Sequence, residues 1–177
     1  MAGDPRIAIV AGSDSDLPHL EDAVEFLEEM GIDYELQVMS AHRSPGKVSA
    51  FAEQAEERGL EVILAAAGGA AHLAGVVAAH TRLPVIGIPI STDRMGGLDS
   101  LFSTVQMPGG VPVASVGLGS SGGENAAVFA ARILALKDED LRERLEEFYE
   151  NMEDEVEQKD RRAQEWLKKQ KKQGPDS

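Results

Sequence analysis

A histidine and an arginine stand side by side where an apolar segment ends. His42 and Arg43 occur in the sequence Ser40-Ala-His-Arg, directly after an expected strand at 34–39. An imidazole can transfer protons near neutral pH, and a guanidinium is suited to binding a phosphate or a carboxylate. The pair predicts a site that binds an anion and moves a proton, although a solvated loop with incidental charges would explain it equally well.

A second candidate is the loop Gly12-Ser-Asp-Ser-Asp16, between an expected strand at 6–11 and an expected helix at 17–30. Its small residues allow a ligand to approach the backbone, and amides at a helix start attract anions. Ser and Asp are also the preferred N-cap residues, so helix capping alone could explain the loop. No lysine follows the glycine and the dinucleotide-binding spacing is absent, which argues against nucleotide hydrolysis and hydride transfer.

The third candidate is a segment with almost no side-chain bulk, at 65–75, where the sequence is Ala-Ala-Ala-Gly-Gly-Ala-Ala-His-Leu-Ala-Gly. Such a thin backbone wall permits close approach by a planar ligand or by another subunit. Tight helix-sheet packing would explain the alanines, but it explains the adjacent Gly68 and Gly69 less well. His72 could contact a ligand or hold the loop, and we favour the supporting role.

The elements that must position these loops alternate between strand and helix. Strands are predicted at 6–11, 34–39, 62–67, 84–88 and 113–116, and helices at 17–30, 45–58, 73–80 and 125–136, with a further helix starting near Asp99. This alternation indicates an α/β fold, a three-layer αβα sandwich with a flavodoxin-like parallel sheet. In such sheets ligands bind beyond the carboxyl ends of the strands, where the three loops are expected.

The pattern changes in the last part of the chain, where one long helix is predicted at 139–172. Apolar residues recur at helical spacing, at Leu141, Leu145, Phe148, Met152 and Val156. This stripe could pack on its own domain or on a neighbouring subunit. We divide the chain into an α/β domain at 1–137 and a helical extension at 138–177, which we expect to pack on a neighbouring subunit and to fray at its end.

Composition excludes several classes of protein. The 177 residues suit one domain, and a formal charge of −14 repels nucleic acid. No stretch is long and apolar enough to span a membrane, and we expect no secretion signal. The absence of cysteine excludes disulfides and a cysteine nucleophile, and it is compatible with a reducing compartment. We therefore expect a cytoplasmic protein with no nucleic-acid or membrane partner.

Together the loops resemble the family of N5-carboxyaminoimidazole ribonucleotide (N5-CAIR) mutases, in its bacterial-type branch. The matching segments are Gly-Ser-x-Ser-Asp at 12–16, Ser-Ala-His-Arg at 40–43, Gly-Gly-Ala-Ala-His-Leu at 68–73, Leu-Pro-Val-Ile-Gly at 83–87, Asp-Ser-Leu at 99–101, Val-Gln-Met-Pro at 105–108 and Asn-Ala-Ala at 125–127. They occur in family order and spacing across most of residues 6–136. Ala66, Ala74 and Val76 depart from the family pattern of Gly, Pro and Met, and these departures concern the fine geometry of the wall.

The resemblance implies an isomerase of purine biosynthesis. Such an enzyme moves a carboxyl group from an exocyclic nitrogen to carbon 4 of the imidazole, by decarboxylation and recarboxylation, with CO2 held in the site and without a cofactor or metal. It implies His42 as the catalytic acid and base and a homo-oligomer, an octamer as in the family. The implied substrate-binding residues are Ser13, Ser15, Asp16, Ser40, Arg43, Gly68, Gly69, Ala70, His72 and Leu73. The alternatives are a carboxylase that uses free CO2 with aminoimidazole ribonucleotide (AIR), and a nucleotide-binding module without turnover.

Overall fold

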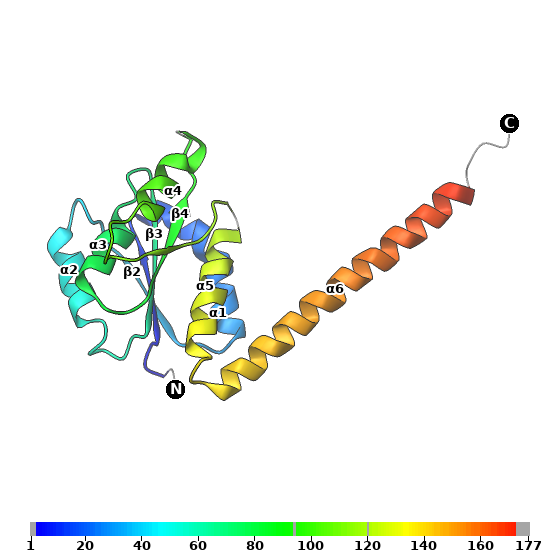
Figure 1. Ribbon diagram of the computed structural model, residues 1–177, viewed down its shortest axis with the longest axis horizontal. Coiled ribbons are helices and arrows are strands. Elements are labelled where there is room, and N and C mark those ends of the chain that lie inside the picture. The colour runs from blue at the N-terminus through cyan, green and yellow to red at the C-terminus, as the bar shows by residue number, and fades with distance from the viewer. Residues whose placement is uncertain (1–2, 94, 120, 173–177) are drawn as a thin grey trace.

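The computed structural model describes residues 3–93, 95–119 and 121–172, so the expectation for residues 173–177 lies outside the described part of the chain. Its centre is a sheet with helices on either side (Figure 1). The sheet has five parallel strands in the order β2-β1-β3-β4-β5. The strands are β1 (Ile7–Ala11), β2 (Tyr34–Val38), β3 (Val62–Gly68), β4 (Val85–Ile90) and β5 (Ala114–Ser115). This order brings the carboxyl ends of β1, β2 and β3 side by side at one edge of the sheet.

Helices cover both faces of the sheet, which confirms the predicted three-layer sandwich. On one face, α1 (Glu21–Glu29) and α5 (Ser121–Leu134) share a core with the side chains of β1, β3 and β4. On the other face lie α2 (Pro45–Gln54) and α3 (Leu73–His80), with α4 (Leu98–Val105) packed over β4. The residues of β1 and β4 are all buried, because parallel strands between two helical layers have no solvent-facing side.

Several element boundaries differ from those predicted. The helix expected at 17–30 begins as a 3-10 turn, η1 (Asp14–Leu20), which contains Pro18, and becomes α-helical only at α1. The second helix stops at Gln54 rather than at residue 58, and β5 has two residues rather than four. A short 3-10 turn, η2 (Met95–Gly97), precedes α4.

The start of α5, expected at residue 125, lies at Ser121 because two glycines belong to the helix. A Cβ atom on Gly122 would lie 2.7 Å from the carbonyl oxygen of Gly117, and one on Gly123 would lie 2.8 Å from that of His19. Glycine therefore permits a close approach of the helix to neighbouring backbone. A sequence pattern alone reads such a pair as a loop.

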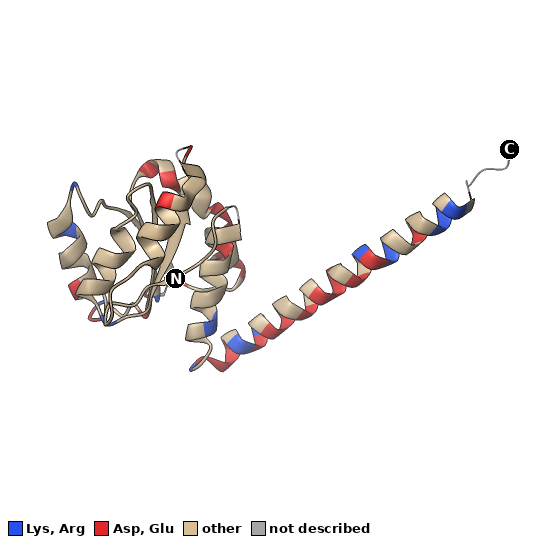
Figure 2. Ribbon diagram, turned by 45° about the horizontal axis from the view of Figure 1, so that its top comes forward, with Lys and Arg blue, Asp and Glu red and all other residues tan. Residues whose placement is uncertain are grey.

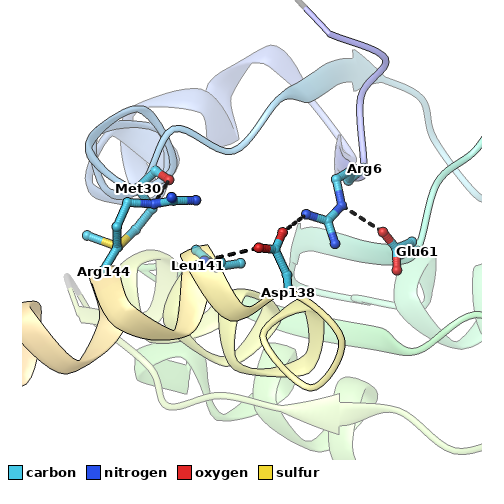
Figure 3. Close-up of polar contacts among 6 residues, drawn as sticks. All are labelled: Arg6, Met30, Glu61, Asp138, Leu141 and Arg144. Atoms are coloured by element: carbon cyan, nitrogen blue, oxygen red, sulfur yellow. Dashed lines mark hydrogen bonds and ion pairs between the residues drawn. The ribbon is translucent and has the colours of Figure 1, made fainter.

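The long helix is α6 (Glu139–Lys172), within the bounds predicted. Asp138 precedes it as an N-cap, since its Oδ1 atom accepts a hydrogen bond of 3.0 Å from the Leu141 amide (Figure 3). Its Oδ2 atom lies 2.5 Å from Nη1 of Arg6, whose Nε atom lies 2.7 Å from Oε1 of Glu61. These contacts lower the pKa of Asp138, with the Leu141 amide as the largest cause and Arg6 next.

Only the first turns of α6 pack on the domain. Leu145 is buried, and the Phe148 ring meets Phe26 of α1 edge to face, at a centroid distance of 5.2 Å. Arg144 donates a hydrogen bond of 3.0 Å to the Met30 carbonyl (Figure 3). The remainder of the helix projects away from the body (Figure 1). No described helix, α6 included, is both long and apolar enough to cross a bilayer.

Candidate active site

A cavity of about 530 Å³ opens at the carboxyl ends of β1, β2 and β3. Its lining comes from the three loops that the sequence singled out, together with the end of β4. The lining residues are Gly12, Ser13, Ser15, Asp16, Ser40, Ala41, His42, Arg43, Ala67, Gly68, Gly69, Ala70, Leu73 and Thr92. The fold therefore brings every sequence-predicted site residue to this cavity except His72, which contacts His42.

The loop after β1 is a capped helix start that also lines the cavity. The Asp16 carboxylate accepts a 3.0 Å hydrogen bond from the Ser13 amide, and the Ser15 amide lies 3.4 Å from the Ser13 hydroxyl. This reciprocal pattern is a capping box, so the capping interpretation describes the local structure correctly. Both amides are engaged within the loop, and their hydrogen-bond donors are not directed to an anion in this state.

Asp16 is 8% exposed, and this burial is the largest cause of a raised pKa for its carboxyl group. The Ser13 amide opposes the rise by stabilising the carboxylate. A partly desolvated carboxylate at a cavity wall is a strong hydrogen-bond acceptor. It suits hydroxyl groups of a ligand rather than a phosphate.

The loop after β2 is a tight turn that presents its two candidate side chains, His42 and Arg43, to solvent. The Ser44 hydroxyl donates to the Ser40 carbonyl at 3.0 Å and accepts from the Ser40 amide at 3.1 Å. The Arg43 amide donates to the Ser40 hydroxyl at 3.2 Å. His42 and Arg43 are both exposed. Among the described residues that line the cavity, Arg43 is the one with a permanent positive charge.

The two histidines of the predicted site are in contact. The Nε2 atom of His42 lies 2.9 Å from the Nδ1 atom of His72, and the rings meet edge to face at 5.0 Å. His72 precedes α3, so this contact ties the loop after β2 to the loop after β3. The geometry fits the supporting role favoured for His72, because its ring holds His42 and does not line the cavity.

The glycine pair of the wall serves two different purposes. A Cβ atom on Gly68 would lie 3.2 Å from the Thr92 side chain, so this position is closely packed. Gly69 has a φ of +67°, a left-handed conformation that favours glycine. Its amide donates a 2.8 Å hydrogen bond to the hydroxyl of Ser100 on α4. Packing against Ile90 at the end of β4 and Thr92 beyond it thus explains Gly68, whereas Gly69 is required by the turn.

Sequence reasoning missed two residues of this site, Thr92 and Ser100. Ser100 lies within the segment Asp-Ser-Leu at 99–101, which carried no functional assignment of its own. The only signal was that a polar pair, Asp99 and Ser100, lies at an expected helix start. In the described ranges, no three or more histidine, aspartate or glutamate side chains converge in a way that could hold a metal ion.

Comparisons of the sequence with known proteins agree on one family. The family described as AIR carboxylase matches residues 6–155. An N5-carboxyaminoimidazole ribonucleotide mutase from Thermotoga maritima is 53% identical over 160 residues, which are 90% of this chain and 92% of that protein. The protein of the same name from Escherichia coli (strain K12) is 48% identical over 151 residues, or 85% of this chain and 89% of that protein.

A solved structure extends the likeness to three dimensions. The crystal structure of Treponema denticola PurE superposes with a TM-score of 0.79 at 28% sequence identity, and the match covers 89% of this chain and 98% of that chain. Residues 6–155, which match the family, include the sheet and the loops that form the cavity. The chain therefore belongs to the AIR carboxylase family.

Proposed function

We propose that this protein is an N5-CAIR mutase, which converts N5-CAIR to 4-carboxyaminoimidazole ribonucleotide (CAIR) in purine biosynthesis. The observation that carries the proposal is the position of His42, an imidazole held by His72 at a cavity that also contains Arg43 and a glycine wall. A site for phosphate binding alone would not require an imidazole. The relatives that are named N5-CAIR mutases support the same reaction.

The proposed reaction has two halves that share one proton carrier. In the first half the bond between the exocyclic nitrogen and the carboxyl carbon breaks, His42 protonates that nitrogen, and AIR and CO2 remain in the site. In the second half carbon 4 of the ring attacks CO2 and forms the new carbon-carbon bond. His42 then removes the proton from carbon 4. One residue can act first as acid and then as base because the proton lost is regained.

The proposed binding mode divides the substrate among the three loops. Arg43 provides the charge for the ribose phosphate, and the hydroxyls of Ser13, Ser15 and Ser40 donate hydrogen bonds to it. Asp16 accepts hydrogen bonds from the ribose hydroxyls. The carboxylate and the transient CO2 lie against the wall formed by Gly68, Gly69, Ala70 and Leu73. No metal, cofactor or nucleic acid takes part in this scheme.

The dependence on bicarbonate tests the proposal against its two alternatives. The purified protein should form CAIR from N5-CAIR faster than an enzyme-free control, in buffer without added bicarbonate. A carboxylase that uses free CO2 would instead form CAIR from AIR only, with a rate that rises with bicarbonate. A non-catalytic module would bind the nucleotide and form no product in either assay.

The distal part of α6 supports a second proposal, that the protein is a homo-oligomer. Met152, Val156 and Trp166 are 51–63% exposed, yet they continue the apolar stripe that is buried at Leu141 and Leu145. A helix of 34 residues is about 51 Å long. Most helical stability comes from packing an apolar face, so the projecting part requires a partner surface.

A second copy of this chain is the partner that fits the charges. Acidic side chains dominate the first half of α6 and basic ones its end (Figure 2). A basic helix end is attracted to an acidic surface, and this chain carries a formal charge of −14. We therefore propose that the extension packs on a neighbouring subunit, in an octamer as expected from the family. We also propose that the protein is located in the cytoplasm.

The position of α4 suggests that the active sites form at subunit contacts. Helix α4 touches the cavity wall through Ser100. Three of its apolar residues are 46–54% exposed: Leu98, Phe102 and Val105. Exposed apolar side chains that are clustered on one short helix are typical of an interface. A neighbouring subunit on this helix would cover the open cavity and limit the escape of CO2.

A further inference from the structure

Ser100 is a buried polar side chain in contact with the wall of the cavity. It lies in the first turn of α4 and is 0% exposed. Its hydroxyl accepts the 2.8 Å hydrogen bond from the Gly69 amide, across 31 residues of sequence. Its carbonyl accepts a 2.8 Å hydrogen bond from the Thr104 hydroxyl. Both contacts are internal, so Ser100 does not touch the substrate.

The bond from Ser100 fixes one peptide of the wall. Gly69 has a left-handed φ of +67°, and its carbonyl accepts a 2.8 Å hydrogen bond from the Ala71 amide. Its amide points to α4 and is therefore not available to a ligand. The next residue, Ala70, lines the cavity, and its amide has no hydrogen-bond acceptor among the described residues. A fixed Gly69 therefore determines where the Ala70 amide lies.

We propose that Ser100 is a positioning residue, which sets the wall so that the Ala70 amide meets the substrate carboxylate and the transient CO2. This inference rests on the proposed mutase function. Without the Ser100 hydroxyl, the Gly69 amide becomes a partly buried donor with no partner, which is unfavourable. The turn then relaxes to satisfy that donor elsewhere. A wall that moves holds CO2 less well, so the defect lies in carboxyl transfer more than in nucleotide binding.

The fate of a labelled carboxyl group separates this role from a purely structural one. N5-CAIR labelled with ¹³C in its carboxyl group is converted in buffer with unlabelled bicarbonate, and the label in CAIR is measured by mass spectrometry. Wild type should retain most of the label. Ser100→Ala should retain less and lose roughly 2- to 12-fold in kcat, the equivalent of one hydrogen bond, with a smaller change in KM.

Ser103→Ala is the matched control, because the one hydrogen bond of its hydroxyl within the described ranges goes to the Asp99 carbonyl of the same helix, at 2.7 Å. It should keep the label as wild type does. Gly69→Ala disturbs the same turn through φ without removing the Ser100 hydroxyl, and it should reproduce the loss of label. It also replaces Ser100→Ala as the test if that variant does not fold.

Two results have distinct meanings. If Ser100→Ala retains label and turnover like Ser103→Ala, Ser100 does not position the wall, whatever the result for Gly69→Ala. If wild type itself loses the label to bicarbonate, the enclosed mutase reaction is wrong, whatever Ser100 does.

Discussion

The Nε2 atom of His42 and the Nδ1 atom of His72 are 2.9 Å apart, so one of these two nitrogens donates a hydrogen bond to the other. If His72 donates, a neutral His42 carries its own proton on Nδ1 and can act there as an acid. If His42 donates, its Nδ1 atom is unprotonated and can act as a base. In either tautomer the Nε2 atom of His42 is engaged by His72, so Nδ1 is the nitrogen left for the proton transfers proposed for His42.

Replacing His72 tests this coupling. His72→Phe keeps an aromatic ring beside His42 but removes the hydrogen bond, worth about 0.5–1.5 kcal/mol. We expect kcat to fall roughly 2- to 12-fold while nucleotide affinity is retained. In the His42→Asn background the same replacement should have little further effect, because the two residues act as a unit. Independent, multiplicative losses in the double variant would separate His72 from the function of His42.

Arg43 is expected to act in binding. Arg43→Ala should weaken nucleotide affinity by about 1.5–3 kcal/mol, the worth of a hydrogen bond to a charged group. Calorimetric titration with AIR measures the loss of affinity. In the same titration with the phosphate-free nucleoside, variant and wild type should bind equally well. Arg82→Ala, at an exposed position outside this cavity, is the control. Unchanged affinity with reduced turnover would contradict the assignment.

We expect the Asp16 carboxylate to strengthen substrate binding and to lower the stability of the fold at neutral pH. Its raised pKa means that the folded state binds a proton more tightly than the unfolded state does, so its stability contribution falls as pH rises through the carboxyl range. Asp16→Asn keeps an acceptor for the Ser13 amide without the charge. We expect a higher Tm than wild type at neutral pH, a smaller difference at acidic pH, and weaker substrate binding. A lower Tm at neutral pH would show that the carboxylate stabilises the fold.

Two truncations separate folding from assembly. Removing everything after Leu136 deletes Leu141 and Leu145, which belong to the core, so the domain should lose several kcal/mol of stability. Removing everything after Asn151 keeps these contacts and deletes only the projecting part of α6. The second variant should keep a Tm close to that of the full chain but form smaller particles in light scattering. If the full chain and the variant that ends at Asn151 form particles of equal size, the protein does not assemble through the distal helix.

The alternation of apolar strands and amphipathic helices was sufficient to predict the layers of the fold. Parallel strands such as β1 and β4 are buried on both sides, so they form continuous apolar runs that are easily recognised. The boundaries were less predictable where tertiary contacts override local preference. Gly122 and Gly123 continue a helix because backbone from distant segments passes close to them.

The candidate site was predictable where it depends on loops that follow strands. His42, Arg43 and Asp16 meet at one cavity because β1, β2 and β3 are neighbours, which the strand alternation implies. The contact between Gly69 and Ser100 was not predictable, because no local pattern shows that a serine on a later helix accepts that amide. The engaged amides of Ser13 and Ser15 likewise depend on side-chain geometry rather than on residue type.

The most direct test of the proposed function is the turnover of His42→Asn. The variant keeps a polar side chain but cannot exchange a proton near neutral pH. Turnover of N5-CAIR should fall ~10²–10⁴-fold, the usual contribution of a general acid-base group, while AIR affinity stays within a few-fold of wild type. The control is His80→Asn. His80 pairs with Glu53 outside the cavity, so this variant should leave turnover unchanged. Near wild-type turnover in His42→Asn would contradict the assignment of the proton transfers to this residue.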